Sequence, residues 1–149
     1  ANSSSWTMYQ IGDSNTSTLT AGGSGSVASS DFDYNATGNS NILTWLQGSS
    51  SAATGGNFDA AITGNTNDLN IRCETIGCVN NWDIDGNSND IDVTQIGTDD
   101  KSITFTLVGD SNNIDIDQTT AASGVTDTIS IVAASTSGTI NLDQCSSGC

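Results

Sequence analysis

A short pattern recurs six times along this chain of 149 residues, and it constrains the fold more than any other feature. Alternating apolar residues lead to a small anchor residue, an asparagine usually follows three positions later, and further alternating apolar residues run to a glutamine. The anchors are spaced 22 to 26 residues apart and are Gly12, Gly38, Gly64, Gly86, Gly109 and Ser135. Repeats of this length indicate a solenoid, a propeller or another stacked array.

The apolar residues of each repeat predict two strands joined by a tight turn. They occupy every second position on both sides of the anchor, as Trp82, Ile84, Ile91 and Val93 do in the fourth repeat. A period of two is typical of a strand with one buried face. Glycine at the anchor suits a turn because it adopts positive φ, and the Asn and Asp residues after it bond to nearby backbone groups.

One pair of strands cannot bury its apolar face alone, but six stacked pairs can. We therefore predict an all-β fold: a single β-solenoid domain over residues 1–149, with six strand–turn–strand coils and two facing parallel sheets. At the usual strand spacing this stack is roughly 29 Å tall. The expected returns between coils are residues 22–31, 48–57, 74–79, 96–102 and 119–128.

Composition narrows the classes of function. A formal charge of −15 with 34% hydrophobic residues is typical of disorder, but the regular placement of the apolar residues argues for a packed core. Arg72 and Lys101 are the only basic residues, so we expect no nucleic-acid partner. No apolar run is long enough to span a membrane, and the opening Ala-Asn-Ser suits a secreted product whose leader has been removed.

Polar residues at inward positions predict ladders that run along the stack. A buried amide needs hydrogen-bond partners, and amides at equivalent positions of neighbouring coils can bond to one another. The ladders are then unsatisfied only at the two ends of the solenoid. The expected ladder residues are Asn41, Asn67, Asn89, Asn112, Gln47, Gln95 and Gln118.

The repeat resembles that of curlin, the subunit of bacterial curli fibres. The segment Gln10-Ile11-Gly12-Asp13-Ser14-Asn15 matches the Gln-x-Gly-x-x-Asn core of that family, and Ser4 and Ser30 stand where its leading serine lies. The family's later glutamine is met by Gln47, Gln95, Gln118 and Gln144, whereas its first glutamine survives only at Gln10. The resemblance implies an extracellular, amyloid-like fibre that serves biofilm or adhesion.

Four cysteines lie in two close pairs. Cys73 and Cys78 bracket one short return, and Cys145 and Cys149 lie near the end of the chain. Four cysteines allow three connectivities, and the spacing favours the two local disulfides. A zinc site is the alternative, although the chain has no histidine. Disulfides indicate an oxidising, extracellular compartment.

Outward positions offer several other sites, each with a plainer interpretation. Sequons make Asn2 and Asn35 candidates for glycosylation. Stacked aspartates could attract Ca²⁺ or simply form a solvated acidic face, and Asp90 with Asp92 could mimic a glycosidase pair or be surface residues. Thr18 and Thr44 begin a row that could bind ice, but Asn70, Asp92 and Asp115 interrupt it. We expect no enzyme, no resident metal and no cofactor. The stacked aspartates are Asp68, Asp90, Asp92, Asp115, Asp117 and Asp143.

Two hypotheses for the function remain. The first is a structural subunit that assembles head to tail, coil 6 of one copy on coil 1 of the next. The second is a monomeric, secreted binding module for ice, glycan or Ca²⁺. Besides copies of itself, we expect a surface or matrix polysaccharide as a partner. Only five residues follow Gln144, so we expect no polar cap there and favour the fibre. The expected assembly interface is Trp6, Met8, Gln10, Asn15, Leu19, Ile129, Ile131, Ala133, Ile140, Leu142 and Gln144.

Overall fold

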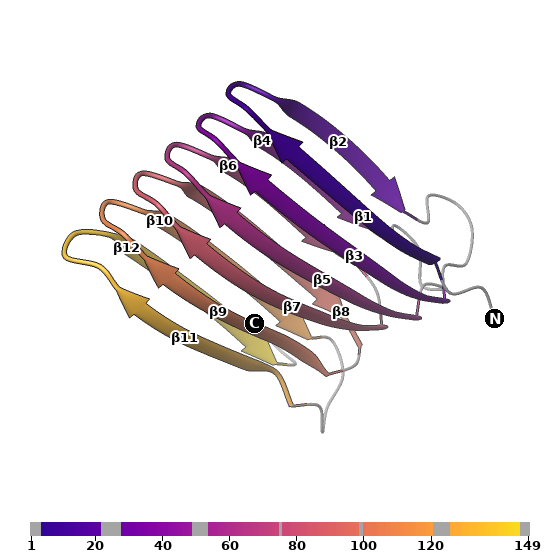
Figure 1. Ribbon diagram of the computed structural model, residues 1–149. Helices are drawn as coiled ribbons and strands as arrows, with labels where there is room; N and C mark the ends of the chain where they lie inside the picture. The colour runs from indigo at the N-terminus through magenta and orange to yellow at the C-terminus, as the bar shows by residue number, and fades with distance from the viewer. Residues whose placement is uncertain are drawn as a thin grey trace.

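Two parallel sheets of six strands each form a β-solenoid in the computed structural model of the chain (Figure 1). The structure describes residues 4–21, 28–48, 54–74, 76–98, 100–120 and 126–146, and these contain no helix. The predicted all-β fold with two facing sheets is therefore confirmed.

The odd-numbered strands form the first sheet and the even-numbered strands form the second. The first sheet contains β1 (Ser4–Ile11), β3 (Ala28–Thr37), β5 (Thr54–Thr63), β7 (Ile76–Asp85), β9 (Lys101–Val108) and β11 (Thr128–Ala134). The second contains β2 (Thr16–Ala21), β4 (Ile42–Gln47), β6 (Asp68–Cys73), β8 (Asp90–Gly97), β10 (Asn113–Thr120) and β12 (Thr139–Ser146). We call each consecutive pair, β1 with β2 through β11 with β12, a coil and number the coils 1 to 6.

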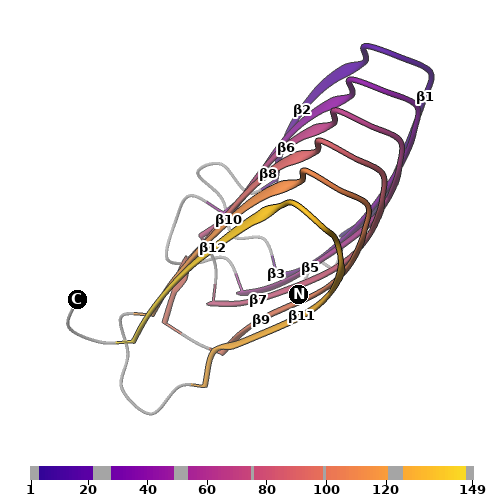
Figure 2. The ribbon, with the colours of Figure 1, turned by 90° about the vertical axis from the view of Figure 1, so that its left-hand side faces the viewer.

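Equivalent residues of neighbouring coils pair with each other throughout both sheets. Trp6 pairs with Phe32, which pairs in turn with Phe58, each 26 residues further along the chain. The shorter repeats keep the same register, since Ile62 pairs with Ile84. Each position of the repeat therefore forms a column along the stack, and the flattened coils lie one behind another in Figure 2.

The core is a thin layer between the two sheets. Inward side chains of coils 2 to 5 are almost fully buried, including Leu69, Ile84, Ile91 and Ile116. Near the first coils the layer is aromatic, with the rings of Phe32 and Trp45 stacked at a centroid distance of 4.2 Å. Because every inward side chain is covered by the coils on either side of it, burial falls at the two ends of the stack.

Strands of the first sheet begin earlier than the alternation of apolar residues indicated. Residues 28–31, 54–57 and 76–79 were expected in returns but lie in β3, β5 and β7. The second sheet also runs on to Gly97 in β8 and to Thr120 in β10. Pairing with a neighbouring coil depends on backbone groups alone, so small polar residues extend a strand without any apolar signal.

The turns at the glycine end repeat one backbone shape. Gly64 adopts a φ of +136°, and Thr66 two residues later lies in the left-handed region at +60°. A Cβ atom on Gly64 would stand 2.2 Å from the carbonyl oxygen of Gly38 in the coil above. Glycine is thus required for its backbone conformation and for the close approach of stacked turns.

Gly64→Ala is expected to destabilise the fold more than Gly12→Ala. Both glycines have positive φ, but a Cβ atom on Gly12 meets only the Asn15 side chain at 3.8 Å because no coil of the same chain lies above it. The difference between the two variants therefore measures the clash, which we expect to cost about 1–3 kcal/mol. Urea unfolding of both variants tests this, and equal losses would contradict it.

Candidate assembly interface

Both ends of the solenoid present strands that pair on one side only. Within the described residues β1 pairs only with β3 and β2 only with β4, while β11 pairs only with β9 and β12 only with β10. We call the open face of coil 1 the first end and the open face of coil 6 the last end. A strand edge carries unpaired N–H and C=O groups and can accept another strand.

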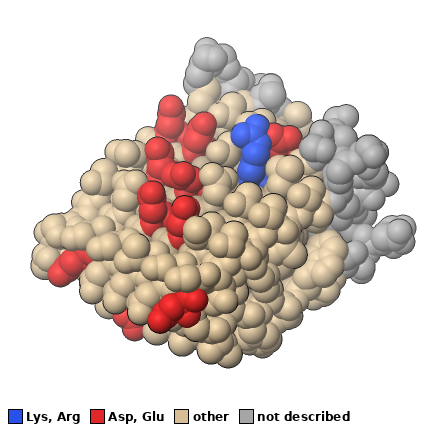
Figure 3. All heavy atoms as spheres, turned by 90° about the horizontal axis from the view of Figure 1, so that it is seen from above, with Lys and Arg blue, Asp and Glu red and all other residues tan. Residues whose placement is uncertain are grey.

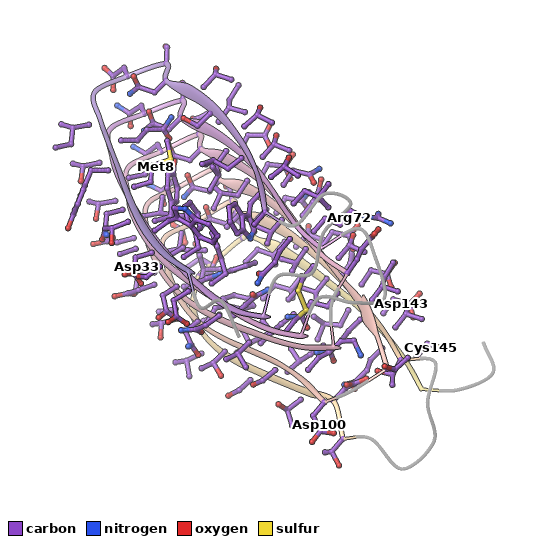
Figure 4. The ribbon with its side chains drawn as sticks, turned by 90° about the vertical axis from the view of Figure 1, so that its right-hand side faces the viewer. Met8, Asp33, Arg72, Asp100, Asp143 and Cys145 are labelled. Carbon is purple, nitrogen blue, oxygen red and sulfur yellow. A yellow bond between two sulfur atoms is a disulfide. The ribbon has the colours of Figure 1, made fainter. Side chains whose placement is uncertain are left out.

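The structure places the predicted interface residues at these two ends. At the first end Trp6 is exposed and Met8 and Leu19 are partly buried, while Gln10 is buried and accepts a hydrogen bond from the Tyr34 hydroxyl. The label on Met8 in Figure 4 marks this end. At the last end Ile129 and Ile131 are partly buried, and the exposed interface residues are Ala133, Ile140, Leu142 and Gln144.

Asparagines three positions after the anchors form a column with a direction. The backbone N–H of Asn41 donates to Oδ1 of Asn67 at 3.0 Å, and that of Asn67 donates to Oδ1 of Asn89 at 2.9 Å. The same bond joins Asn15 to Asn41 and Asn89 to Asn112. Each coil thus donates to the next coil along the chain, so the column runs from coil 1 to coil 5 and stops at Gly138.

A second column, one position after the anchors, was not predicted as a ladder. Here the backbone N–H of each coil donates back to the side chain of the coil before it, as Asn65 does to Oδ1 of Asn39 at 2.9 Å. The column reaches the last end, where Thr136 donates to Asp110 at 2.7 Å. Hydrogen bonds from Thr136 lower the pKa of Asp110. The sequence signal was the unbroken row of Asp and Asn at this position, which we had assigned to local turn bonds.

Glutamines near the ends of the second-sheet strands form a shorter ladder than expected. Gln144 donates to Oε1 of Gln118 at 2.7 Å, and Gln118 donates to Oε1 of Gln95 at 2.9 Å. Gln47 is buried but lies outside this ladder, because Cys73 stands between it and Gln95 in the register. Its Nε2 instead lies 3.5 Å from the carbonyl oxygen of Gly55.

A disulfide joins Cys73 and Cys78, as predicted, and their Cα atoms are 6.4 Å apart. Both cysteines are buried, and the bond lies between the sheets where coil 3 continues into coil 4 (Figure 4). The second predicted pair is Cys145 with Cys149, and Cys149 lies outside the described residues.

Lys101 is buried, although its charge favours an exposed position. Its Nζ lies 3.7 Å from Oδ1 of Asp127 and donates to the hydroxyl of Thr120 at 2.6 Å. The Thr120 hydroxyl in turn donates to Asp127. A lysine is rarely buried unless it is paired. The ion pair could have been predicted from the register, because Lys101 and Asp127 occupy equivalent inward positions of coils 5 and 6.

Aspartates gather on the outer face of the second sheet, where Figure 3 shows a patch of acidic side chains. Asp92 lies between Asn70 and Asp115 in the register. Asp92 is exposed, but partial desolvation by its neighbours, and then repulsion from Asp90, Asp115 and Asp68, raises its pKa. Because the folded state holds this pKa above its usual value, the stability linked to protonated Asp92 is lost as pH rises through the raised pKa.

The acidic face offers no metal centre among the described residues. No group of three or more His, Cys, Asp or Glu side chains is placed to hold a metal ion in residues 4–146 outside the gaps. Asn113 relieves part of the repulsion by donating to Asp90 at 2.8 Å. Asp90 and Asp92, the pair weighed as glycosidase-like, both lie exposed on the open surface of β8.

Other sites weighed in the sequence analysis are scattered over the surface. Thr18 and Thr44 are paired neighbours, and Asn70 follows them in the same column. Asn35 lies on β3 at the outer face of the first sheet, and Asn2 lies outside the described residues. Asn35 borders a shallow depression of about 510 Å³ whose lining includes Tyr9, Asp33 and Asp59, and the outward position of Asp33 is visible in Figure 4.

Comparisons with known proteins do not identify a family for the chain. No family model matches the chain, and neither a curated protein nor a solved structure does. Among the described residues, none lies in a helix long and apolar enough to cross a membrane.

Proposed function

We propose that this protein is the structural subunit of an extracellular, amyloid-like fibre that assembles head to tail and serves biofilm or adhesion. The observation that carries the proposal is the pair of open ends. Edge strands of both sheets, with apolar side chains beside them, lie at coil 1 and at coil 6. Joining unlike ends is a heterologous contact that does not close, and such a contact builds a filament.

The ends favour a second copy of the chain over a small ligand. A new coil supplies two parallel strands, and both sheets of the solenoid can accept them in the register that already joins coils 1 to 6. Leu142 at the last end is 51% exposed, whereas Ile116 at the same position of coil 5 is fully buried. Docking another coil removes this apolar surface from water.

The proposed extracellular setting and the family likeness rest on other observations. The Cys73–Cys78 disulfide suits an oxidising compartment. The curlin-like character rests on the sequence motif at residues 10–15 and on the later glutamines. The acidic outer face keeps charge on the sides of a fibre, which opposes sideways association.

Electron microscopy of the purified protein tests the fibre. We expect unbranched filaments with an axial repeat of roughly 29 Å, six strand spacings for each subunit. A protein that stays monomeric at high concentration contradicts the proposal and favours the binding module. The depression beside Tyr9 on the first sheet is then the surface to test with polysaccharides.

Leu142→Glu is expected to abolish filaments and leave the monomer folded. The side chain is half exposed in the monomer, so a charge is tolerated there, but a docked coil would bury it without a partner. Asn141→Glu is the matched control, since Asn141 is the neighbouring residue of β12 and lies at an outward position. Filament yield and circular dichroism separate assembly from folding, and equal yields from both variants would contradict the expectation.

A further inference from the structure

The most exposed outward apolar side chains of the first sheet lie at the two ends of the stack. The three most exposed large ones are Ile11 at 79%, Tyr9 at 70% and Val132 at 65%. Tyr9 and Val132 occupy the same column, and the four coils between them place Asn35, Ala61, Asp83 and Thr106 there. The coils between them expose smaller apolar side chains less fully, Val79 at 40% and Val108 at 45%, so the most exposed apolar surface of this face lies at its two ends, which indicates that the ends meet.

This inference rests on the proposed function. We propose that the joint, the contact between two subunits of the fibre, has one register: coil 6 continues onto coil 1 of the next copy, with Val132 beside Tyr9 and Ala134 beside Ile11. In this register, residues at equivalent positions of the repeat pair across the joint, as they do between neighbouring coils within the chain. This register pairs the outward apolar side chains of the first sheet at the two ends with each other, and neighbouring side chains on one face of paired strands stabilise a sheet.

The hydrogen-bond columns give the joint its direction. Within the chain the backbone N–H at the asparagine position of each coil donates to Oδ1 of the next coil. Coil 6 has Gly138 at that position, and in this register the same bond runs from its N–H to Oδ1 of Asn15 in the following copy. The turn column continues in the opposite sense, from the N–H of Asp13 in that copy to the hydroxyl of Thr136. Two like ends cannot complete either column.

Charges agree with the same register. Inside the chain carboxylates stack on carboxylates, as Asp92 does on Asp115 and Asp117 on Asp143. At the joint no carboxylate meets another, because coil 1 carries threonines at its outward positions on β2. Asp143 lies opposite Thr20, and Asn141 lies opposite Thr18. Repulsion between stacked carboxylates therefore lies within each chain and not at the joint.

Cysteine cross-linking of two exposed positions tests this joint. Tyr9→Cys and Val132→Cys, each in the full chain with its native disulfide intact, are polymerised separately and together and then oxidised mildly. Neighbouring strands about 4.8 Å apart place paired residues within disulfide range. We expect covalent dimers only in the mixture, mapped to the two substituted peptides. The off-register control, Thr7→Cys with Val132→Cys, shifts the partner by two residues and should cross-link at least tenfold more slowly.

The possible outcomes separate the joint from the fibre. Dimers from Tyr9→Cys alone or from Val132→Cys alone mean that like ends meet, which overturns the joint and leaves the fibre standing. Equal cross-linking in the off-register control, or filaments with no cross-link in the mixture, overturns the joint in the same way. A wild-type chain that forms no filaments removes the proposed function and the joint with it.

Discussion

Ile91→Asp is expected to prevent folding, whereas Asp90→Asn on the preceding residue leaves the fold intact. Ile91 is fully buried between the sheets, and no basic group lies in its column, which reads Leu69, Ile91 and Ile114. An unpaired carboxylate there costs several kcal/mol, a large part of the roughly 5–15 kcal/mol that stabilises a typical domain. Leu69→Asp should act in the same way.

Asp90→Asn is the matched control because it changes an exposed side chain on the same strand. It removes one charge from a row in which Asp68 is the paired neighbour, so repulsion falls slightly. Far-ultraviolet circular dichroism and soluble yield measure both variants. Similar losses from Ile91→Asp and Asp90→Asn would show that the inward and outward positions of β8 are assigned to the wrong faces.

Asp127→Asn is expected to lower the free energy of unfolding by about 3–5 kcal/mol, because it leaves the buried Lys101 ammonium without its counter-ion. Lys101 is 1% exposed, and its Nζ contacts both Thr120 and Asp127. Denaturant titration measures the change. Asp143→Asn, an exposed carboxylate in the same coil, should change stability by less than about 0.5 kcal/mol.

Removing both charges distinguishes pairing from packing. A Lys101→Met/Asp127→Leu double variant should recover most of the stability that Asp127→Asn loses, since apolar replacements of a buried pair are often neutral. A double variant as unstable as Asp127→Asn would mean that the shape of this corner, and not the buried charge, determines its stability.

The repeat predicted most of the fold because the residues of each column lie at a constant distance in sequence from the anchor of their own repeat. Once Gly38 and Gly64 are aligned, Phe32 and Phe58 must pair, and the structure pairs them. The ends of the strands were less predictable. Thr54 and Gly56 carry no apolar pattern, and β5 begins there because their backbone continues the pairing with β3.

Polar columns were the harder part of the candidate site. Asn67 donates amide to amide to Asn89 at 3.0 Å, as expected, but the bond common to the whole column starts from a backbone N–H, which has no sequence signature. Gln47 was predicted in the glutamine ladder, but Cys73 occupies the equivalent position of the next coil and separates Gln47 from Gln95. The burial of Lys101 was not predicted, because its partner Asp127 lies 26 positions away in the sequence.

The constant register of the columns means that subunit length and joint chemistry are independent of each other. Residues 38–63 form one complete period, and their removal would bring Gly64 onto the turn of Gly12 with every column still in phase. Such a chain keeps coils 1 and 6, so both assembly surfaces remain and only the axial repeat of the filament becomes shorter. Insertion or deletion of complete repeats thus changes the length of the subunit without changing the surfaces through which it binds another copy.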